Sequence, residues 1–268
     1  MRADLFLSDR DYVESRQKAQ RLIKNGCVTI DGRVIDKPSF ELDENVSHTV
    51  EIKETDEDRY VSRGGLKLEA ALIEFGVFPD GLICADIGAS TGGFTDCLLK
   101  RGAARVYAFD SGKGQLHQSL VSDERVISRE SFNARYITRE DVGEDIDLAV
   151  MDVSFISQTM ILPSLKELLG RDGMIISLIK PQFEAGRQAL GKNGIVTRKE
   201  DRYSAVLRVV ESASLIGLCC KRFMVSPIKG GDGNEEYLAC FVRSECEGKT
   251  IITDKENIKN AVYGKDKK

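Results

Sequence analysis

The sequence predicts an α/β protein with a Rossmann-like, mostly parallel sheet that ends in an antiparallel hairpin, preceded by a small α+β unit. Three observations support this class. Short apolar runs alternate with amphipathic helical patterns over most of the chain, which is typical of a parallel sheet covered on both faces. Towards the end, two strand-like runs follow each other without a helix between them. Near the start, a helical pattern is followed by a hairpin signal.

Residues 15–25 predict the first well-marked helix, and it is strongly basic. Its apolar side consists of Ala19, Leu22 and Ile23. Its basic residues, with no acid among them, are Arg16, Lys18, Arg21 and Lys24. A solvated helix face explains this pattern as well as a nucleic-acid contact does. Because the net charge of the whole chain is −4, any contact with a polyanion must be local.

A hairpin and a domain boundary follow this helix. Residues 27–36 alternate apolar and polar side chains on either side of Asp31-Gly32, a pair that supplies the positive φ angles of a tight turn. A short strand at 48–52 then leads into the acidic, turn-rich stretch 53–59. We therefore place the domain boundary near residues 55–60, which makes 1–59 the small unit.

Strands and helices alternate from residue 60 to residue 246. The strand patterns lie, in order, at 82–88, 105–110, 125–130, 146–155 and 173–180. Helical patterns between and after them include 157–170 and 201–217. Two final strands, at 219–228 and 235–242, are joined by the turn 229–234 and so predict an antiparallel pair. Residues 247–268 read as a polar tail.

Composition narrows the class of protein further. The chain has 268 residues, of which 41% are hydrophobic and 31% charged, as in an ordinary globular protein. Its apolar runs reach only strand length, so we expect neither a signal peptide nor a membrane span. Seven cysteines lack any C-x-x-C spacing, which favours reduced, structural thiols in a cytoplasmic protein.

The stretch "ADIGASTGGFTDCLL", residues 85–99, predicts a strand, a glycine-rich turn and a helix, an arrangement that binds ligands at the sheet edge. It fits neither a dinucleotide fingerprint nor a phosphate loop, so S-adenosylmethionine is favoured. The next strand ends in a carboxylate suited to the two ribose hydroxyls of an adenosyl group. Tight packing is the alternative explanation for the glycines. The candidate cofactor-binding residues are Asp86, Gly88, Ala89, Ser90, Gly92, Gly93, Phe94, Asp110 and Asp152.

Two later strands end in Asp152 and Lys180, where they would flank a reacting methyl group. Asp152 is followed by Val-Ser-Phe, which lacks the two prolines that enzymes methylating exocyclic amines tend to carry, so base methylation is disfavoured. A ribose hydroxyl is weakly acidic and needs help to lose its proton. Lys180 with an ordinary pKa orients the oxygen, whereas burial or a second cation such as Lys67 would lower its pKa enough to act as a base. The sequence leaves both roles open.

Six segments carry a resemblance to a known family. They are "YVSRGGLKL", "ADIGASTGGFTDCLL", "VMDVSF", "IKPQFEAGR", "GKNGIV" and "GNEEYL". With "ESRQKAQRLIKNGCVTIDGRVIDKP", the chain resembles the haemolysin A (TlyA) family, in which an FtsJ-like ribose methyltransferase follows an α-L RNA-binding motif. The resemblance implies a class I methyltransferase fold with a seven-stranded sheet, with S-adenosylmethionine as cofactor and no metal. It also implies that the enzyme 2′-O-methylates ribosomal RNA in ribosomal subunits. The expected target is the ribose of a cytidine.

The resemblance also implies a catalytic tetrad of Lys67, Asp152, Lys180 and Glu236. The pattern G-N-x-E-aromatic matches at Glu236, directly before Tyr237. In this interpretation Lys180 serves the 2′-hydroxyl while the other three residues orient it and tune the charge. Arg63 is expected to hold a backbone phosphate, although a surface salt bridge explains it equally well.

Two rival functions remain open on the sequence. One is a non-catalytic RNA-binding or ribosome-assembly factor that keeps the methyltransferase fold. The other is a membrane-acting haemolysin, as the family's traditional name suggests, but no amphipathic or spanning segment supports it. The sequence does not indicate an oligomeric state.

Overall fold

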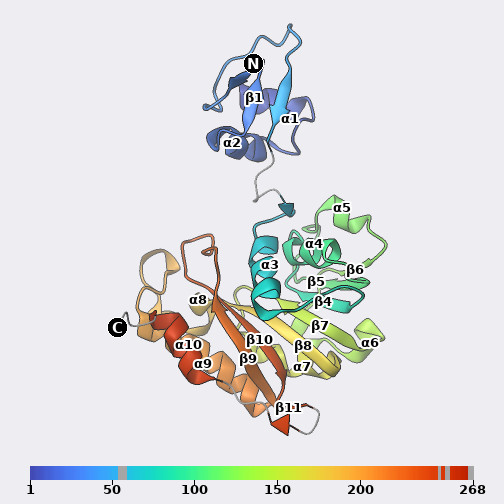
Figure 1. Ribbon diagram of the computed structural model, residues 1–268, viewed down its shortest axis with the longest axis vertical. Helices are drawn as coiled ribbons and strands as arrows, with labels where there is room; N and C mark the ends of the chain where they lie inside the picture. Colours follow the sequence, from blue (N-terminus) through green and yellow to red (C-terminus); the bar gives the residue numbers. More distant parts are fainter. Residues whose placement is uncertain (54–58, 247–248, 251–253, 265–268) are drawn as a thin grey trace. The chain divides into compact units, whose positions relative to one another are not determined.

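The computed structural model describes residues 1–53, 59–246, 249–250 and 254–264, and the chain divides into two compact units between Arg59 and Tyr60 (Figure 1). Most of the acidic stretch predicted as the boundary, residues 54–58, lies outside the described residues. Each unit has its own hydrophobic core. The two units are therefore described separately.

The small unit contains two helices packed on each other and a three-stranded antiparallel sheet with the order β2-β1-β3. Its elements are α1 (Ala3–Asp9), α2 (Arg16–Lys24), β1 (Val28–Ile30), β2 (Arg33–Val34) and β3 (Val50–Ile52). The predicted hairpin is confirmed, because Ile30 pairs with Arg33 across a two-residue turn. Asp31 and Gly32 both have positive φ, 51° and 76°. The apolar side predicted for α2 is buried.

The large unit contains a seven-stranded sheet with the order β6-β5-β4-β7-β8-β10-β9. β10 is antiparallel to both of its neighbours, and the other pairs are parallel. The strands are β4 (Ile83–Ile87), β5 (Arg105–Phe109), β6 (Val126–Arg129), β7 (Ile146–Met151), β8 (Leu169–Ile179), β9 (Leu218–Val225) and β10 (Tyr237–Arg243). This sheet confirms the predicted fold class.

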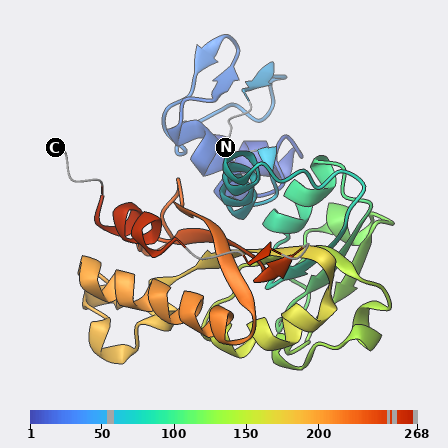
Figure 2. The ribbon, with the colours of Figure 1, turned by 60° about the horizontal axis from the view of Figure 1, so that its bottom comes forward.

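Helices cover both faces of this sheet. They are α3 (Gly64–Phe75), α4 (Gly93–Lys100), α5 (Gln118–Val121), α6 (Arg139–Val142), α7 (Leu162–Leu168), α8 (Pro181–Glu184), α9 (Lys199–Leu215) and α10 (Lys255–Tyr263). Strand residues alternate between two cores: Leu148 and Val150 pack with α3 and α4, whereas Ala149 packs with α7 and α9. In Figure 2 the teal α3 and the orange α9 lie on opposite sides of the strands.

The last part of the chain differs from the polar tail that its composition predicts. Residues 254–264 contain α10, whose Ile258 and Val262 are buried in the core formed with α9 and β9. These two side chains are one helical turn apart and so share a face. The prediction missed them because only two large apolar residues mark this short helix. Residues 247–248, 251–253 and 265–268 lie outside the described residues.

Candidate active site

The glycine-rich turn follows β4 at the carboxyl edge of the sheet. Gly88, Ser90 and Gly92 all have positive φ, so the chain reverses sharply before α4 begins at Gly93. A Cβ on Gly88 would lie 2.5 Å from the carbonyl oxygen of Asp152, because β4 and β7 end side by side. Only glycine permits this close approach. The turn thus brings bare backbone to the edge where ligands of such sheets bind.

Two adjoining cavities lie at this edge, and both are within the range of sizes expected for small-molecule sites. The larger, of about 510 Å³, includes Asp110, Phe132 and Ile161 in its lining. The smaller, of about 290 Å³, includes Arg63, Lys67 and Lys180. Both cavities are lined by Gly88, Ser90, Asp152 and Ser154. A ligand in one cavity therefore meets a ligand in the other at these four residues.

Asp110 lies directly after β5 and is held rigidly in the larger cavity. Its Oδ2 accepts a hydrogen bond from Ser90 N at 2.7 Å, and its Oδ1 accepts one from Gly112 N at 2.6 Å. A carboxylate has about four acceptor sites, so acceptor capacity remains for two ribose hydroxyls. With apolar walls from Phe132 and Ile161, the cavity suits an adenosyl group. Asp110 therefore fits the role predicted for it.

Lys180, Asp152 and Lys67 line the smaller cavity together. Lys180 follows β8 directly, and its Nζ lies 2.6 Å from Asp152 Oδ1 in an ion pair. Nζ also donates a hydrogen bond to Ser154 Oγ at 3.0 Å. An ammonium group has three N–H donors, and among the described residues only Ser154 accepts a hydrogen bond from this one, so donor capacity remains for an oxygen atom in the cavity. This arrangement can orient a hydroxyl and stabilise negative charge on it.

Glu236 stands behind Lys67 rather than in the cavity lining. Lys67, in the first turn of α3, donates from Nζ to Glu236 Oε2 at 2.6 Å. The side chains are 11% and 2% exposed, so this ion pair is nearly excluded from water. The two residues are 169 positions apart in the chain. The four residues predicted as a tetrad therefore form two ion pairs, Lys180 with Asp152 and Lys67 with Glu236.

Two predicted cofactor residues, Asp86 and Gly92, line neither cavity. Asp86 is completely buried in β4, where its Oδ2 accepts a hydrogen bond from Thr95 Oγ1 at 2.7 Å. Burial raises the pKa of this carboxyl group to about 7, against the effect of the Thr95 bond. A Cβ on Gly92 would lie 2.2 Å from a Leu120 methyl carbon. Gly92 therefore serves the packing of the turn, the alternative left open by the sequence. The other predicted cofactor residues line at least one cavity.

Several lining residues were not predicted from the sequence, of which Ser154 and Phe155 matter most. Phe155 is 90% exposed, has a positive φ of 62°, and lies beside Phe183 with ring centroids 5.0 Å apart. A positive φ at a bulky residue is uncommon, and such strain concentrates at functional sites. Their position two and three residues after Asp152, just beyond a strand end, was the signal that would have identified both residues.

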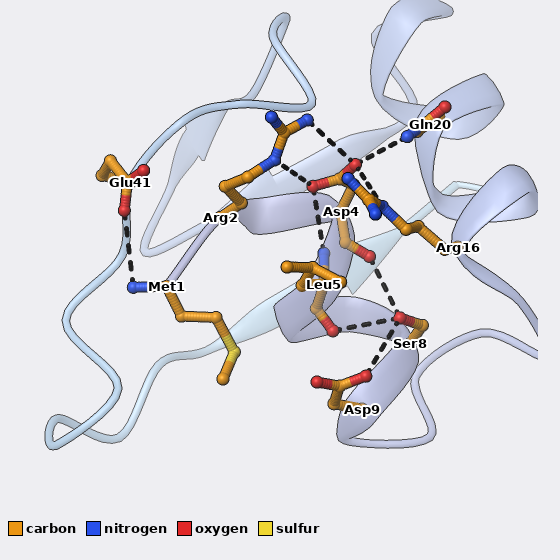
Figure 3. Close-up of polar contacts among 9 residues, drawn as sticks. All are labelled: Met1, Arg2, Asp4, Leu5, Ser8, Asp9, Arg16, Gln20 and Glu41. Carbon is orange, nitrogen blue, oxygen red and sulfur yellow. Dashed lines mark hydrogen bonds and ion pairs between the residues drawn. The ribbon is translucent and has the colours of Figure 1, made fainter.

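The basic helix α2 is partly neutralised within the small unit. Arg16 Nε lies 2.9 Å from Oδ2 of the buried Asp4, which also binds Arg2 and Gln20 (Figure 3). These donors hold the pKa of the Asp4 carboxyl group well below its usual range. Lys18 pairs with Glu14. Arg16 thus has a structural partner, while Lys24 is exposed, Arg21 is half-buried, and Arg63 lines the smaller cavity of the large unit.

The strand order, the glycine turn after the first strand of the sheet and the carboxylate after the second define an S-adenosylmethionine-dependent methyltransferase. Asp110 and the apolar walls of the larger cavity fit the adenosyl part of this cofactor. The chain belongs to the FtsJ-like methyltransferase family, whose model matches residues 60–243. An S4 domain model matches residues 1–47.

Relatives of known name cover most of the chain. It is 44% identical to the 16S/23S rRNA (cytidine-2'-O)-methyltransferase TlyA of Mycobacterium tuberculosis, over 88% of this chain and 87% of the relative. It is 42% identical to Hemolysin A of Brachyspira hyodysenteriae, over 90% and 100%. A solved structure from Streptococcus thermophilus, named as a hemolysin, is 39% identical with a TM-score of 0.75, covering 98% of this chain and 94% of that one. Within the described residues, no helix is long and apolar enough to span a membrane.

Proposed function

We propose that this enzyme transfers the methyl group of S-adenosylmethionine to the 2′-hydroxyl of a cytidine in ribosomal RNA. The observation that carries this proposal is the Lys180 ammonium group in the smaller cavity, which contacts Asp152 and Ser154, two of the residues that line both cavities. Relatives from Mycobacterium tuberculosis and Campylobacter jejuni, at 44% and 34% identity, are named rRNA (cytidine-2'-O)-methyltransferases. Their names support the choice of substrate.

In the proposed mechanism, the ribose hydroxyl enters the smaller cavity and accepts a hydrogen bond from Lys180 Nζ. The cofactor, when bound, supplies an electrophilic methyl group. Asp152 fixes the position of the Lys180 Nζ, and the cation favours negative charge on the ribose oxygen while the methyl group is transferred to that oxygen and its proton passes to water. Lys67, held by Glu236, adds a second positive charge to the same cavity. Orientation of the oxygen by two fixed cations is thus the main contribution of these side chains.

We assign recognition of RNA to three further features. Exposed Lys24 on α2 and Arg63 beside the smaller cavity are suited to backbone phosphates, which give affinity without sequence preference. The exposed ring of Phe155 adjoins the shared part of the cavities and is suited to stack on an unstacked base. The target nucleotide would then be turned out of its surroundings before methylation.

The proposal is tested with purified protein, radiolabelled S-adenosylmethionine and ribosomal subunits, followed by digestion of the RNA to nucleosides. Label is expected on the ribose of cytidine, and label found only on bases would refute the proposal. Lys180→Ala is expected to abolish transfer while cofactor affinity by calorimetry is retained. Lys221→Ala, at an exposed position on the edge strand β9, is the matched control and should remain fully active.

A further inference from the structure

The carboxyl group of Glu236 is enclosed by the turn that connects β9 to β10. Its Oε2 accepts the hydrogen bond from Lys67, and its Oε1 faces the backbone of Gly230. A Cβ on Gly230 would lie 2.4 Å from Oε1 and 3.1 Å from Cδ of Glu236. Gly230 does not have a positive φ, so its own backbone conformation would accept an alanine. The glycine is needed here only because the carboxyl group occupies the space of a side chain.

Asn234 holds this turn in place. It is 1% exposed, and its backbone oxygen accepts a hydrogen bond from Gly230 N at 2.9 Å, which closes the turn over Glu236. Its side chain reaches a different segment: Oδ1 accepts from Val196 N at 3.0 Å, and Nδ2 donates to Gly194 O at 3.2 Å. Both ends of the buried amide are thus satisfied. Asn234 joins the 191–196 loop to the turn that precedes Glu236.

We propose that Gly230 and Asn234 are positioning residues for methyl transfer: Gly230 leaves the space in which the Glu236 carboxyl group lies, and Asn234 holds the turn closed around it. The carboxylate is then kept on Lys67, and Lys67 is kept in the cavity. This inference rests on the proposed function, since the position of the Lys67–Glu236 pair affects the rate only if Lys67 helps to orient the ribose oxygen during methyl transfer.

The test compares two adjacent glycines. In Gly230→Ala the added methyl group displaces the Glu236 carboxyl group, because a contact of 2.4 Å is too short to persist. In Gly231→Ala the methyl group meets no atom within 4 Å, and the backbone again lacks a positive φ. We expect kcat of Gly230→Ala to fall on the order of 10²-fold with KM for the cofactor unchanged, as for a misplaced catalytic group. Gly231→Ala should keep the wild-type kcat. Wild-type kcat in Gly230→Ala would overturn the inference.

A double-mutant cycle separates positioning from damage to the turn. In a Glu236→Ala background no carboxyl group remains to be displaced, so adding Gly230→Ala should cost nothing further in single-turnover rate. If the second substitution lowers the rate equally in both backgrounds, the effect lies in the turn itself and the inference is wrong. If Glu236→Ala alone keeps the full rate, Glu236 has no role in methyl transfer. That result would refute both the proposed role of Glu236 and the inference about Gly230 that depends on it.

Asn234 is tested by amide hydrogen exchange together with activity. Asn234→Ala removes both side-chain bonds to the 191–196 loop, so exchange at Val196 N should accelerate, as should exchange at Gly230 N when the turn loosens. We expect kcat to fall with little change in cofactor affinity. Full activity despite faster exchange would contradict the role of Asn234. If this variant does not fold, Asn234→Asp, which keeps an acceptor for Val196 N and loses the donor to Gly194 O, takes its place in the same two measurements.

Discussion

The raised pKa of Asp86, in the strand that precedes the glycine-rich turn, can be tested quantitatively through protein stability. Its side chain is completely buried in β4, and burial raises the pKa of its carboxyl group to about 7. Its Oδ1 has no hydrogen-bond partner among the described residues, whereas Oδ2 accepts the bond from Thr95. Asp86→Asn mimics the neutral form of the group and keeps an acceptor for Thr95. The substitution therefore removes the titration while preserving the shape of the side chain.

The magnitude follows from the raised pKa. The unfolded chain releases the Asp86 proton near pH 3.8, whereas the folded protein keeps it until about pH 7. Between these values the folded state binds more protons, so the stabilisation is fully present below pH 3.8 and is lost as pH rises through 7. One pKa unit corresponds to about 1.4 kcal/mol. The free energy of unfolding should therefore lose roughly 3 kcal/mol from this group between pH 5 and pH 8.

The assay is urea denaturation of the wild type and Asp86→Asn at pH 5, 6, 7 and 8, following the transition of the large unit. Other titrating groups are common to both proteins, so the difference between them isolates Asp86. Wild-type stability should fall relative to the variant by roughly 3 kcal/mol across this range, with most of the change below pH 7. A difference that stays constant from pH 5 to pH 8 would show that the pKa of Asp86 is not raised.

Three further predictions concern the site and RNA binding. Asp152→Asn should lower kcat by at least about 10²-fold, because the Lys180 cation loses the carboxylate that fixes it; a smaller effect in single-turnover assays would count against the pairing. Phe155→Ala should raise KM for RNA by about 5- to 100-fold with cofactor affinity unchanged, whereas Phe78→Ala, exposed but lining neither cavity, should not. Lys24→Ala should weaken RNA binding and reduce the salt slope of the affinity by about 1; an unchanged slope would remove Lys24 from the interface.

Local patterns predicted the secondary structure and the sheet because each pattern depends on neighbouring residues. The hairpin at Asp31-Gly32 follows from two left-handed residues between alternating segments, and both have the expected φ. The strands of the large sheet were visible because their apolar residues form continuous runs, as burial on both faces requires. Asp152 and Lys180 could be brought together in advance, since adjacent parallel strands end at one edge of the sheet.

Contacts between distant segments could not be predicted in this way. Nothing around Arg16 in the sequence indicates its pairing with Asp4, because the buried carboxylate lies on a different helix. The close approach of the Glu236 carboxyl group to Gly230 could not be predicted either, since that glycine is indistinguishable in sequence from its neighbour Gly231. The family resemblance placed Lys67 and Glu236 in one site but did not predict their ion pair, and the two residues are 169 positions apart.

The reversed strand β10 explains how Glu236 reaches this edge of the sheet. The parallel strands β7 and β8 present their carboxyl ends here, followed by Asp152 and Lys180. β10 runs the other way and pairs Tyr237 with Ile179, so the residue before Tyr237 lies level with Lys180. A parallel strand in the same place would bring Arg243 to this edge and would carry the β9–β10 turn to the opposite one. The antiparallel insertion therefore supplies both the carboxylate that holds Lys67 and the glycine turn that encloses it.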